Sequence, residues 1–242
     1  KDSKIKVLHS NKSVIAYFFL VSITFAIIEL SPSWLTEIQP DSSGYLNVSQ
    51  SRQTLYYLLI TLLNKIGINI ILFQKILLSF SIISLVLFIG RSTSVLLGFS
   101  SYLLIILNTY YISYSKTILP ESIVFSLLNF AIVYLFEEKR SSLISFALIC
   151  GCLASLKPIG VLLSLILSII FFIKKKINYK VFFFLIFFAV PNVIENYFFY
   201  SHFKDRTTVF KQIVVGKLVI LSGKESFIIN DYSEELHPLL EK

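Results

Sequence analysis

The 242-residue sequence contains no methionine, only two cysteines and few charged residues. Charged residues make up 15% of the chain and hydrophobic residues 55%, and the mean hydropathy is +0.78. A soluble domain carries about 25% charged residues, and one core cannot bury this much apolar surface. These values exclude an ordinary water-soluble globular protein and favour a protein whose excess apolar surface lies in a bilayer.

Methionine is missing even at position 1, which predicts a processed chain or a piece of a longer protein. Cys150 and Cys152 lie two positions apart in an apolar run, so on a helix they point in different directions. This spacing argues against a disulfide framework and against a metal site. The sequence also has no glycine-rich phosphate loop and no basic-aromatic platform, so no nucleic-acid partner is expected despite the net charge of +8.

Seven apolar runs are each predicted to form a membrane-spanning helix, because about 20 apolar residues cross the roughly 30 Å of bilayer hydrocarbon. Several runs are short, and we expect polar flanks, tilt or local thinning to make up the difference. No small-x-small cleavage site follows the first run, so we interpret it as a span rather than a signal peptide. The predicted spans are 14–30, 70–89, 93–107, 122–136, 142–156, 159–173 and 181–200.

Lysine and arginine are distributed unevenly around these spans. Eleven lie in the N-terminal tail or in turns on the same side, five lie on the opposite side, and six follow Tyr200. The positive-inside rule therefore predicts a cytoplasmic N-terminus and places the long loop at 31–69 on the outer face. The net charge is then mainly a signal for membrane topology.

Acidic residues gather on the side that this count places outside. Glu37, Asp41 and Glu121 lie in outer loops, while Glu29 and Glu195 lie near the outer ends of the first and seventh spans. Glu195 is expected either to line the lipid-access side of the last helix or to make a polar contact between helices. Carboxylate chemistry is therefore expected at the outer face.

The outer loop contains the segment E-I-Q-P-D-S-S-G-Y-L, which predicts a turn followed by a short helix. A carboxylate at such a turn, here Asp41, can act above the membrane as a general base or a metal ligand. On its own, however, Asp41 is more simply explained as a helix cap.

A run of leucines at helical spacing follows between Gln53 and Lys65. The run is too short to span a bilayer, so we predict an interfacial helix with its leucine face toward the membrane and with Tyr56 and Tyr57 at headgroup level. The alternative is that this segment forms the outer end of a long second span.

Two further outer turns carry charged residues. Lys116 and Glu121 lie between the third and fourth spans; alone, Glu121 is a first-turn acid favoured by the helix dipole, and beside Asp41 it is a candidate second member of a site. In the next outer turn only Lys157 and Pro158 separate two apolar runs. A lysine there is costly unless it snorkels to ordinary headgroups or meets an anion, for which a lipid phosphate is the obvious candidate at that depth.

In their order, spacing and common side, these features resemble the lipid-dependent GT-C glycosyltransferases, the superfamily that includes protein O-mannosyltransferases and aminoarabinose transferases. The family usually has two prolines after the basic residue of the interfacial helix, and this chain lacks both. The resemblance covers nearly the whole chain and implies an all-α polytopic membrane protein, with a GT-C-type transmembrane module at 1–200 and an outer-face tail at 201–242. The matching segments are D-S-S-G-Y at 41–45, R-Q-T-L-Y-Y at 52–57, Glu121 and Lys157-Pro158.

The resemblance implies an inverting enzyme that moves a sugar from a polyprenyl-phosphate donor to a glycan, lipid or protein acceptor, and we expect a bacterial inner membrane as its setting. By this analogy Asp41 takes the acceptor proton, while Glu121 orients the acceptor, the base or a divalent cation. Some relatives use a divalent cation and others do not, so Asp41 and Glu121 are the expected ligands if a cation such as Mg²⁺ or Mn²⁺ binds to this chain. The residues expected to neutralise the leaving phosphate are Arg52, Lys116 and Lys157, and those expected to bind substrate are Tyr45, Tyr56 and Tyr57.

Two other functions stay open at the level of sequence. A transporter or flippase of a lipid-linked saccharide would also be polytopic, but we expect it to place polar groups at mid-membrane between repeated halves, and no internal repeat is visible. A non-catalytic membrane subunit predicts that Asp41 and Glu121 can be replaced without loss of function.

Overall fold

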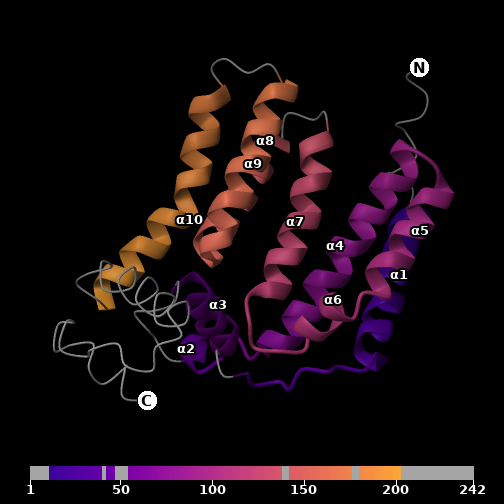
Figure 1. The fold of residues 1–242 in the computed structure, drawn as a ribbon, viewed down its shortest axis with the longest axis horizontal. Coiled ribbons are helices and arrows are strands. Elements are labelled where there is room, and N and C mark those ends of the chain that lie inside the picture. The colour runs from indigo at the N-terminus through magenta and orange to yellow at the C-terminus, as the bar shows by residue number, and fades with distance from the viewer. Residues whose placement is uncertain (1–10, 40–41, 47–53, 138–141, 176–179, 203–242) are drawn as a thin grey trace, which may run out of the picture.

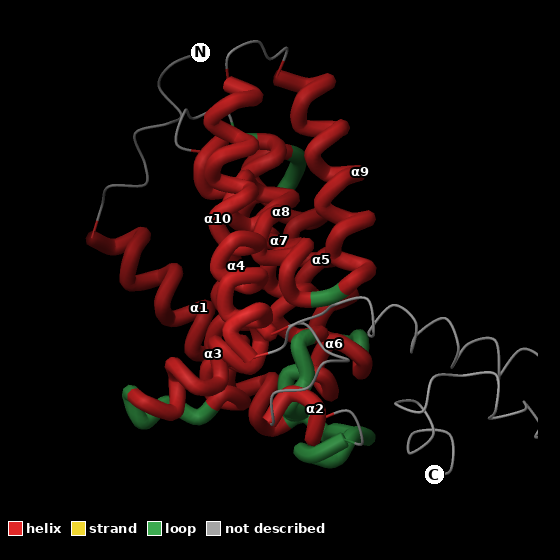
Figure 2. Tube along the Cα trace, turned by 90° about the vertical axis from the view of Figure 1, so that its left-hand side faces the viewer, coloured by secondary structure: helices red, strands yellow, loops and turns green. Residues whose placement is uncertain are grey.

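The computed structural model describes the chain except for residues 1–10, 40–41, 47–53, 138–141, 176–179 and 203–242. All regular secondary structure in the described part is helical (Figures 1 and 2). An all-α fold is therefore confirmed for this part of the chain. The helices are α1 (Asn11–Leu30), α2 (Ser43–Leu46), α3 (Thr54–Lys65), α4 (Ile70–Ser92), α5 (Val95–Ile106), α6 (Thr109–Tyr114), α7 (Glu121–Phe136), α8 (Ser142–Leu156), α9 (Pro158–Lys175) and α10 (Lys180–His202).

Seven of these helices coincide with the seven apolar runs, each to within three residues at either end. Two described segments, Ser13–Leu30 in α1 and Ile70–Ser92 in α4, are long and apolar enough to cross a membrane. The described apolar parts of the other five helices are shorter. The helical state of the seven runs is thus confirmed, and length and composition mark two of them as candidate membrane spans.

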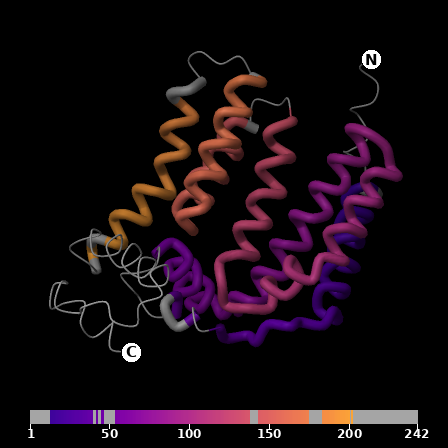
Figure 3. Tube along the Cα trace, viewed as in Figure 1, coloured from indigo at the N-terminus to yellow at the C-terminus, as the bar shows by residue number. Residues whose placement is uncertain are grey.

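The long helices stand side by side and run alternately up and down, as the course of the chain in Figure 3 shows. α4 packs against α1, α5 and α7, while α8 packs against α7, α9 and α10. The short helices α2, α3 and α6 gather at one end of the bundle, opposite the start of α1 (Figures 1 and 3). We call this the α3 end; the loop after α1 and the start of α7 also lie there.

The loop after α1 is fastened to the turn before α7. The backbone N–H of Ile118 donates a hydrogen bond of 2.9 Å to the carbonyl of Glu37. Trp34 packs edge to face on Tyr110 of α6, with ring centroids 5.3 Å apart. These contacts hold two segments that are distant in sequence against each other at the α3 end.

Hydrogen bonds between side chains, and one from a side chain to a backbone carbonyl, join neighbouring apolar helices. Such bonds are a common means of helix association in an apolar environment, where a polar group without a partner is costly. A glycine also lets the α9 backbone approach α8 closely. A Cβ on Gly160 of α9 would lie 1.8 Å from the carbonyl oxygen of Leu153 in α8. The joining pairs are Tyr17–Ser84 at 2.8 Å, Asn129–Ser81 at 3.1 Å, Ser155–Asn192 at 2.9 Å and Ser164–Cys150 carbonyl at 2.7 Å.

The helix predicted at 53–65 is present as α3, and it is separate from α4. Gly67, at a φ of +74°, lies in the turn between the two helices, a conformation that glycine adopts without steric cost. The alternative of one long second span is therefore wrong. The position of Tyr56 differs from the prediction. Its side chain is fully buried in the protein rather than exposed at headgroup level, and its hydroxyl accepts a hydrogen bond from Gln74 of α4.

Candidate functional site

The centre of the candidate site is an ion pair between Lys157 and Glu121. Glu121 is the first residue of α7, and Lys157 joins α8 to α9. The Lys157 ammonium donates a hydrogen bond to Glu121 Oε1, and the two side chains are 25% and 22% exposed. The packing of α7 against α8 brings the two residues together. The sequence predicted both residues but not that they pair.

The position of Glu121 at the start of α7 favours its negative charge. The N-terminus of α7 carries the positive end of the helix dipole, which stabilises a negative charge in the first turn. The preceding residue, Pro120, makes no side-chain capping bond to the helix.

Lys157 keeps further N–H donors beyond the one used by Glu121, since an ammonium group has three. The pair therefore presents a partly exposed cation that can still receive an anion.

Buried polar atoms without a hydrogen-bond partner cluster around Glu121. Within the described part of the chain these include Glu121 Oε2, Gln74 Oε1 and Ser122 Oγ. Gln74 is adjacent because its Nε2 donates to the carbonyl of Leu119, at 2.6 Å. An unpaired buried polar atom costs about 1–3 kcal/mol, and such atoms in a native fold call for water, an ion or a ligand. We call these three residues together with Lys157 the Glu121 cluster.

Two tyrosines pack behind the cluster. Tyr56 accepts a hydrogen bond of 2.9 Å from Gln74 Nε2, and Tyr45 packs edge to face on its ring with centroids 5.2 Å apart. Burial raises the pKa of Tyr56, the hydrogen bond from Gln74 lowers it in part, and the negative charge of Glu121 raises it again. Tyr56 therefore stays a neutral phenol that fixes α3 against α4, and it is not placed to exchange protons. Tyr57 is half-buried, with its ring centroid 6.0 Å from that of Phe198.

Lys116 does not lie with this cluster. Its ammonium donates to the carbonyls of Glu29, at 2.8 Å, and of Ser31, so it caps the end of α1. Lys75 also donates to the Glu29 carboxylate, at 2.6 Å. Burial lowers the pKa of Lys116, the charge of Lys75 lowers it further, and Glu29 opposes both effects. The structure thus assigns Lys116 a local capping contact with α1.

Asp41 and Arg52 lie outside the described residues, as does the tail from residue 203. Among the residues that are described, no three His, Cys, Asp or Glu side chains come together in a group that could hold a metal ion. Glu121, the described member of the expected ligand pair, is instead neutralised by Lys157. In the described part of the chain the counter-charge of Glu121 is therefore the Lys157 ammonium.

Glu195 of α10 makes a polar contact that the sequence left open. Its side chain is 3% exposed, and Oε1 accepts hydrogen bonds from the backbone N–H and from the hydroxyl of Thr54, each at 3.1 Å. A carboxylate at the first residue of α3 satisfies an unpaired helix donor and interacts favourably with the helix dipole. The expected contact between helices is confirmed. The sequence signal is an acid within an apolar run, but nothing in the sequence names Thr54 as its partner.

No family model, no curated protein and no solved structure matches this chain. Its function is therefore inferred from its own geometry, which is a helical bundle with two candidate membrane spans and a polar ion-pair cluster at the α3 end.

Proposed function

We propose that the chain is a seven-span membrane glycosyltransferase of GT-C type, which transfers a sugar from a polyprenyl-phosphate donor to an acceptor at the α3 end. The observation that carries this proposal is the ion pair of Lys157 with Glu121 at one end of an apolar bundle. A lysine held at that depth, with donors to spare, is suited to the phosphate of a lipid carrier. The buried unpaired oxygens beside it are suited to a polar substrate.

The exposed surface supports embedding in a membrane. Large apolar side chains are exposed along α1, α5, α9 and α10, and contiguous apolar surface of this kind is stable against lipid and not against water. The positive-inside count orients the bundle with the start of α1 in the cytoplasm and the α3 end outward. Examples of the exposed side chains are Phe18, Phe19, Leu96, Leu104, Leu165, Ile169, Leu185 and Ile194.

The proposed reaction is a single displacement at the anomeric carbon of the sugar. An acceptor hydroxyl or amine attacks this carbon, the bond to the phosphate oxygen breaks, and the polyprenyl phosphate leaves with the electron pair. Lys157 neutralises the charge that grows on the phosphate. Asp41, whose assignment rests on the sequence pattern, takes the proton of the acceptor. No enzyme nucleophile takes part, so the anomeric configuration inverts.

Glu121 has two functions in this scheme. Through Oε1 it holds the Lys157 ammonium in place. Its second oxygen, buried and without a partner in the described part of the chain, accepts a hydrogen bond from the bound acceptor. Tyr45, Tyr56 and Gln74 act as positioning residues, because their contacts hold α2 and α3 against the core beside Glu121.

The test is transfer of label from a pool of polyprenyl-phosphate sugars in membranes that carry equal amounts of wild type or variant. Lys157→Gln and Asp41→Asn are each expected to lower transfer about 100-fold, the cost of losing one group that stabilises charge in the transition state. The matched control is Lys75→Gln, which removes another lysine–glutamate pair, Lys75 with Glu29. This control is expected to stay within about threefold of wild type, because Lys75 pairs with a half-exposed glutamate at the end of α1 and lies outside the Glu121 cluster.

Equal transfer by wild type and Lys157→Gln would contradict the proposed phosphate contact. A wild type that transfers no sugar from any donor, but moves a labelled lipid-linked sugar across the bilayer, would establish the transporter instead.

A further inference from the structure

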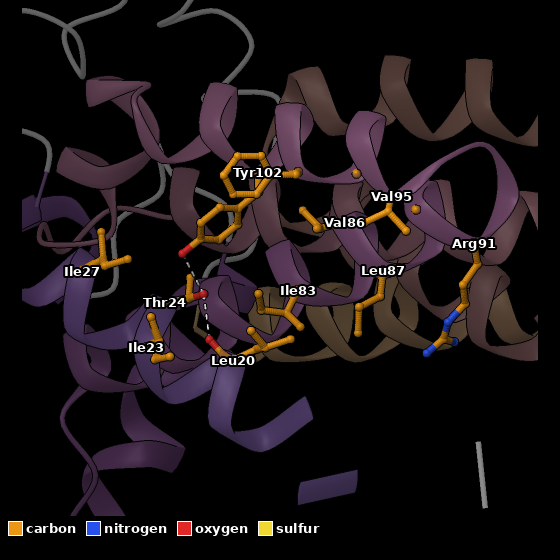
Figure 4. A pocket seen from close by; sticks show the side chains of 13 residues that line it. Leu20, Ile23, Thr24, Ile27, Ile83, Val86, Leu87, Arg91, Val95 and Tyr102 are labelled. Carbon is orange, nitrogen blue, oxygen red and sulfur yellow. Dashed lines mark hydrogen bonds between the residues drawn. The ribbon is translucent and has the colours of Figure 1, made fainter. Parts of the chain in front are cut away.

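A second ligand site is suggested by a groove of about 530 Å³ between α1, α4 and α5. Figure 4 shows its walls, which are mainly aliphatic side chains such as Ile23 of α1, Ile83 and Leu87 of α4, and Val95 of α5. The hairpin of α4 and α5 closes tightly near one end, since a Cβ on Gly98 would lie 3.0 Å from the Cα of Gly90. None of the residues of the Glu121 cluster lines this groove.

The two ends of the groove differ in polarity. At one end the Thr24 hydroxyl donates to the carbonyl of Leu20 at 2.9 Å and lies 3.3 Å from the hydroxyl of Tyr102 (Figure 4). These polar groups hydrogen-bond to one another, so this end of the groove is apolar. At the other end lies Arg91, an exposed side chain in the last turn of α4 and the only charged residue among the described residues that line the groove.

The length of the groove suits one leaflet of a bilayer. Ile83 and Arg91 are eight residues apart on α4, which is about 12 Å along the helix axis. The hydrocarbon of one leaflet is about 15 Å thick, half of the full core. In the proposed topology the Arg91 end faces the cytoplasm, so an acyl chain of the inner leaflet that lies along the groove has its headgroup at the guanidinium.

We propose that this groove binds one acyl chain of an anionic phospholipid of the cytoplasmic leaflet, with the lipid phosphate on Arg91. Charge complementarity selects this occupant, because a guanidinium binds phosphate through charge-assisted hydrogen bonds and favours lipids of net negative charge. The inference rests on the membrane embedding of the proposed function and not on sugar transfer.

The test is a lipid titration of the purified full chain in detergent, followed by native mass spectrometry. The probes are phosphatidylglycerol, phosphatidylcholine with the same acyl chains, and inorganic phosphate. We expect phosphatidylglycerol to bind tightest and Arg91→Gln to weaken its binding about tenfold, the effect of one charged hydrogen bond. Binding of phosphatidylcholine is expected to be the same in the Arg91→Gln variant and in wild type.

Two further variants separate the groove from general attraction of anionic lipid. Lys174→Gln is the charge control, because Lys174 lies over the ring of Phe136, 3.8 Å from its centroid, and does not line the groove. It is expected to bind both lipids like wild type. Val86→Phe places a larger side chain in the groove and is expected to weaken binding of both lipids.

Equal loss of phosphatidylglycerol binding in Arg91→Gln and Lys174→Gln, or unchanged binding of both lipids to Val86→Phe, would overturn the site. Inorganic phosphate that competes fully with the lipid would reduce it to a simple anion site and also overturn it. Wild type that binds phosphatidylglycerol as expected but transfers no sugar would refute only the glycosyltransferase.

Discussion

Lys157 and Glu121, 36 residues apart in sequence, form an ion pair that ties the α8–α9 junction to the first turn of α7. Each side chain is about one-quarter exposed, so each charge is partly removed from water and depends on the other for compensation. The pair consequently has a structural function in the fold as well as the proposed contact with a lipid phosphate.

Removing one partner is expected to destabilise the fold more than removing both. Lys157→Met leaves Glu121 without its counter-charge, at a cost of about 1–3 kcal/mol, between the values for exposed and buried pairs. The double variant with Glu121→Leu should recover most of that loss. Unfolding of the chain in detergent micelles measures both. Equal destabilisation by the single and double variants would show that the two charges do not compensate each other.

Thr54→Val is expected to loosen the start of α3. The substitution removes the hydroxyl that donates to Glu195 Oε1, at a cost of about 1 kcal/mol, and hydrogen exchange of the first amides of α3 should become faster. Thr61→Val is the matched control, because the Thr61 hydroxyl donates to the carbonyl of Tyr57 in its own helix, at 3.0 Å. Similar exchange rates in the two variants would argue that the contact with α10 does not stabilise α3.

Gly160→Ala is expected to disrupt the packing of α8 on α9. The added methyl would lie 1.8 Å from the Leu153 carbonyl oxygen, so backbone must move, at a cost of about 3 kcal/mol or more. Gly90→Ala is the control, since its Cβ has no neighbouring atom closer than 4.0 Å and alanine favours a helix. Thermal unfolding should separate the two variants by several degrees. A stable Gly160→Ala protein would mean that α9 can shift away from α8 at little cost.

Tyr56→Phe is expected to change how the free energy of unfolding depends on pH under alkaline conditions. Burial raises the pKa of Tyr56 in the folded state, whereas an unfolded tyrosine ionises near pH 10. The stability that this difference contributes is complete below about pH 10, and it is lost as pH rises further because only the unfolded chain releases the proton. Above that pH, the free energy of unfolding should fall less steeply with pH in the variant than in wild type, by about 1.4 kcal/mol per pH unit.

Near neutral pH the same variant should lose only about 1 kcal/mol, because Gln74 Nε2 keeps its bond to the Leu119 carbonyl. Unfolding free energies measured from neutral to alkaline pH test both statements. Parallel curves for wild type and variant would show that Tyr56 ionises normally in the folded protein.

Much of the helical structure follows from local sequence. The seven apolar runs and the leucine-rich segment before Gly67 each became a helix near the expected bounds, because hydrophobic runs and turn residues act over a few neighbouring positions. The orientation of Tyr56 did not follow in this way. Tyr56 is hydrogen-bonded to Gln74, a residue of the next helix. The spacing of residues within α3 does not predict that partner.

The candidate site was predicted residue by residue rather than as an arrangement. Lys116 and Lys157 were both expected to meet the donor phosphate, and Glu121 was expected to be the second acid of the site. In the structure Lys116 bonds to the end of α1, while Lys157 pairs with Glu121. Sequence spacing gives the side of the bundle on which a charge lies. It does not give the distances between charges on different helices.

The sequence by itself determined the all-helical class, the positions of the long helices and the gathering of several charged residues toward one end. Hydropathy and turn chemistry are local properties, and alternating helices carry every second turn to the same end. Only the tertiary structure decided that Lys157 pairs with Glu121 and that Glu195 caps α3 at Thr54. These contacts depend on how the helices pack and on sub-ångström shifts of side chains, which no single segment of the chain specifies.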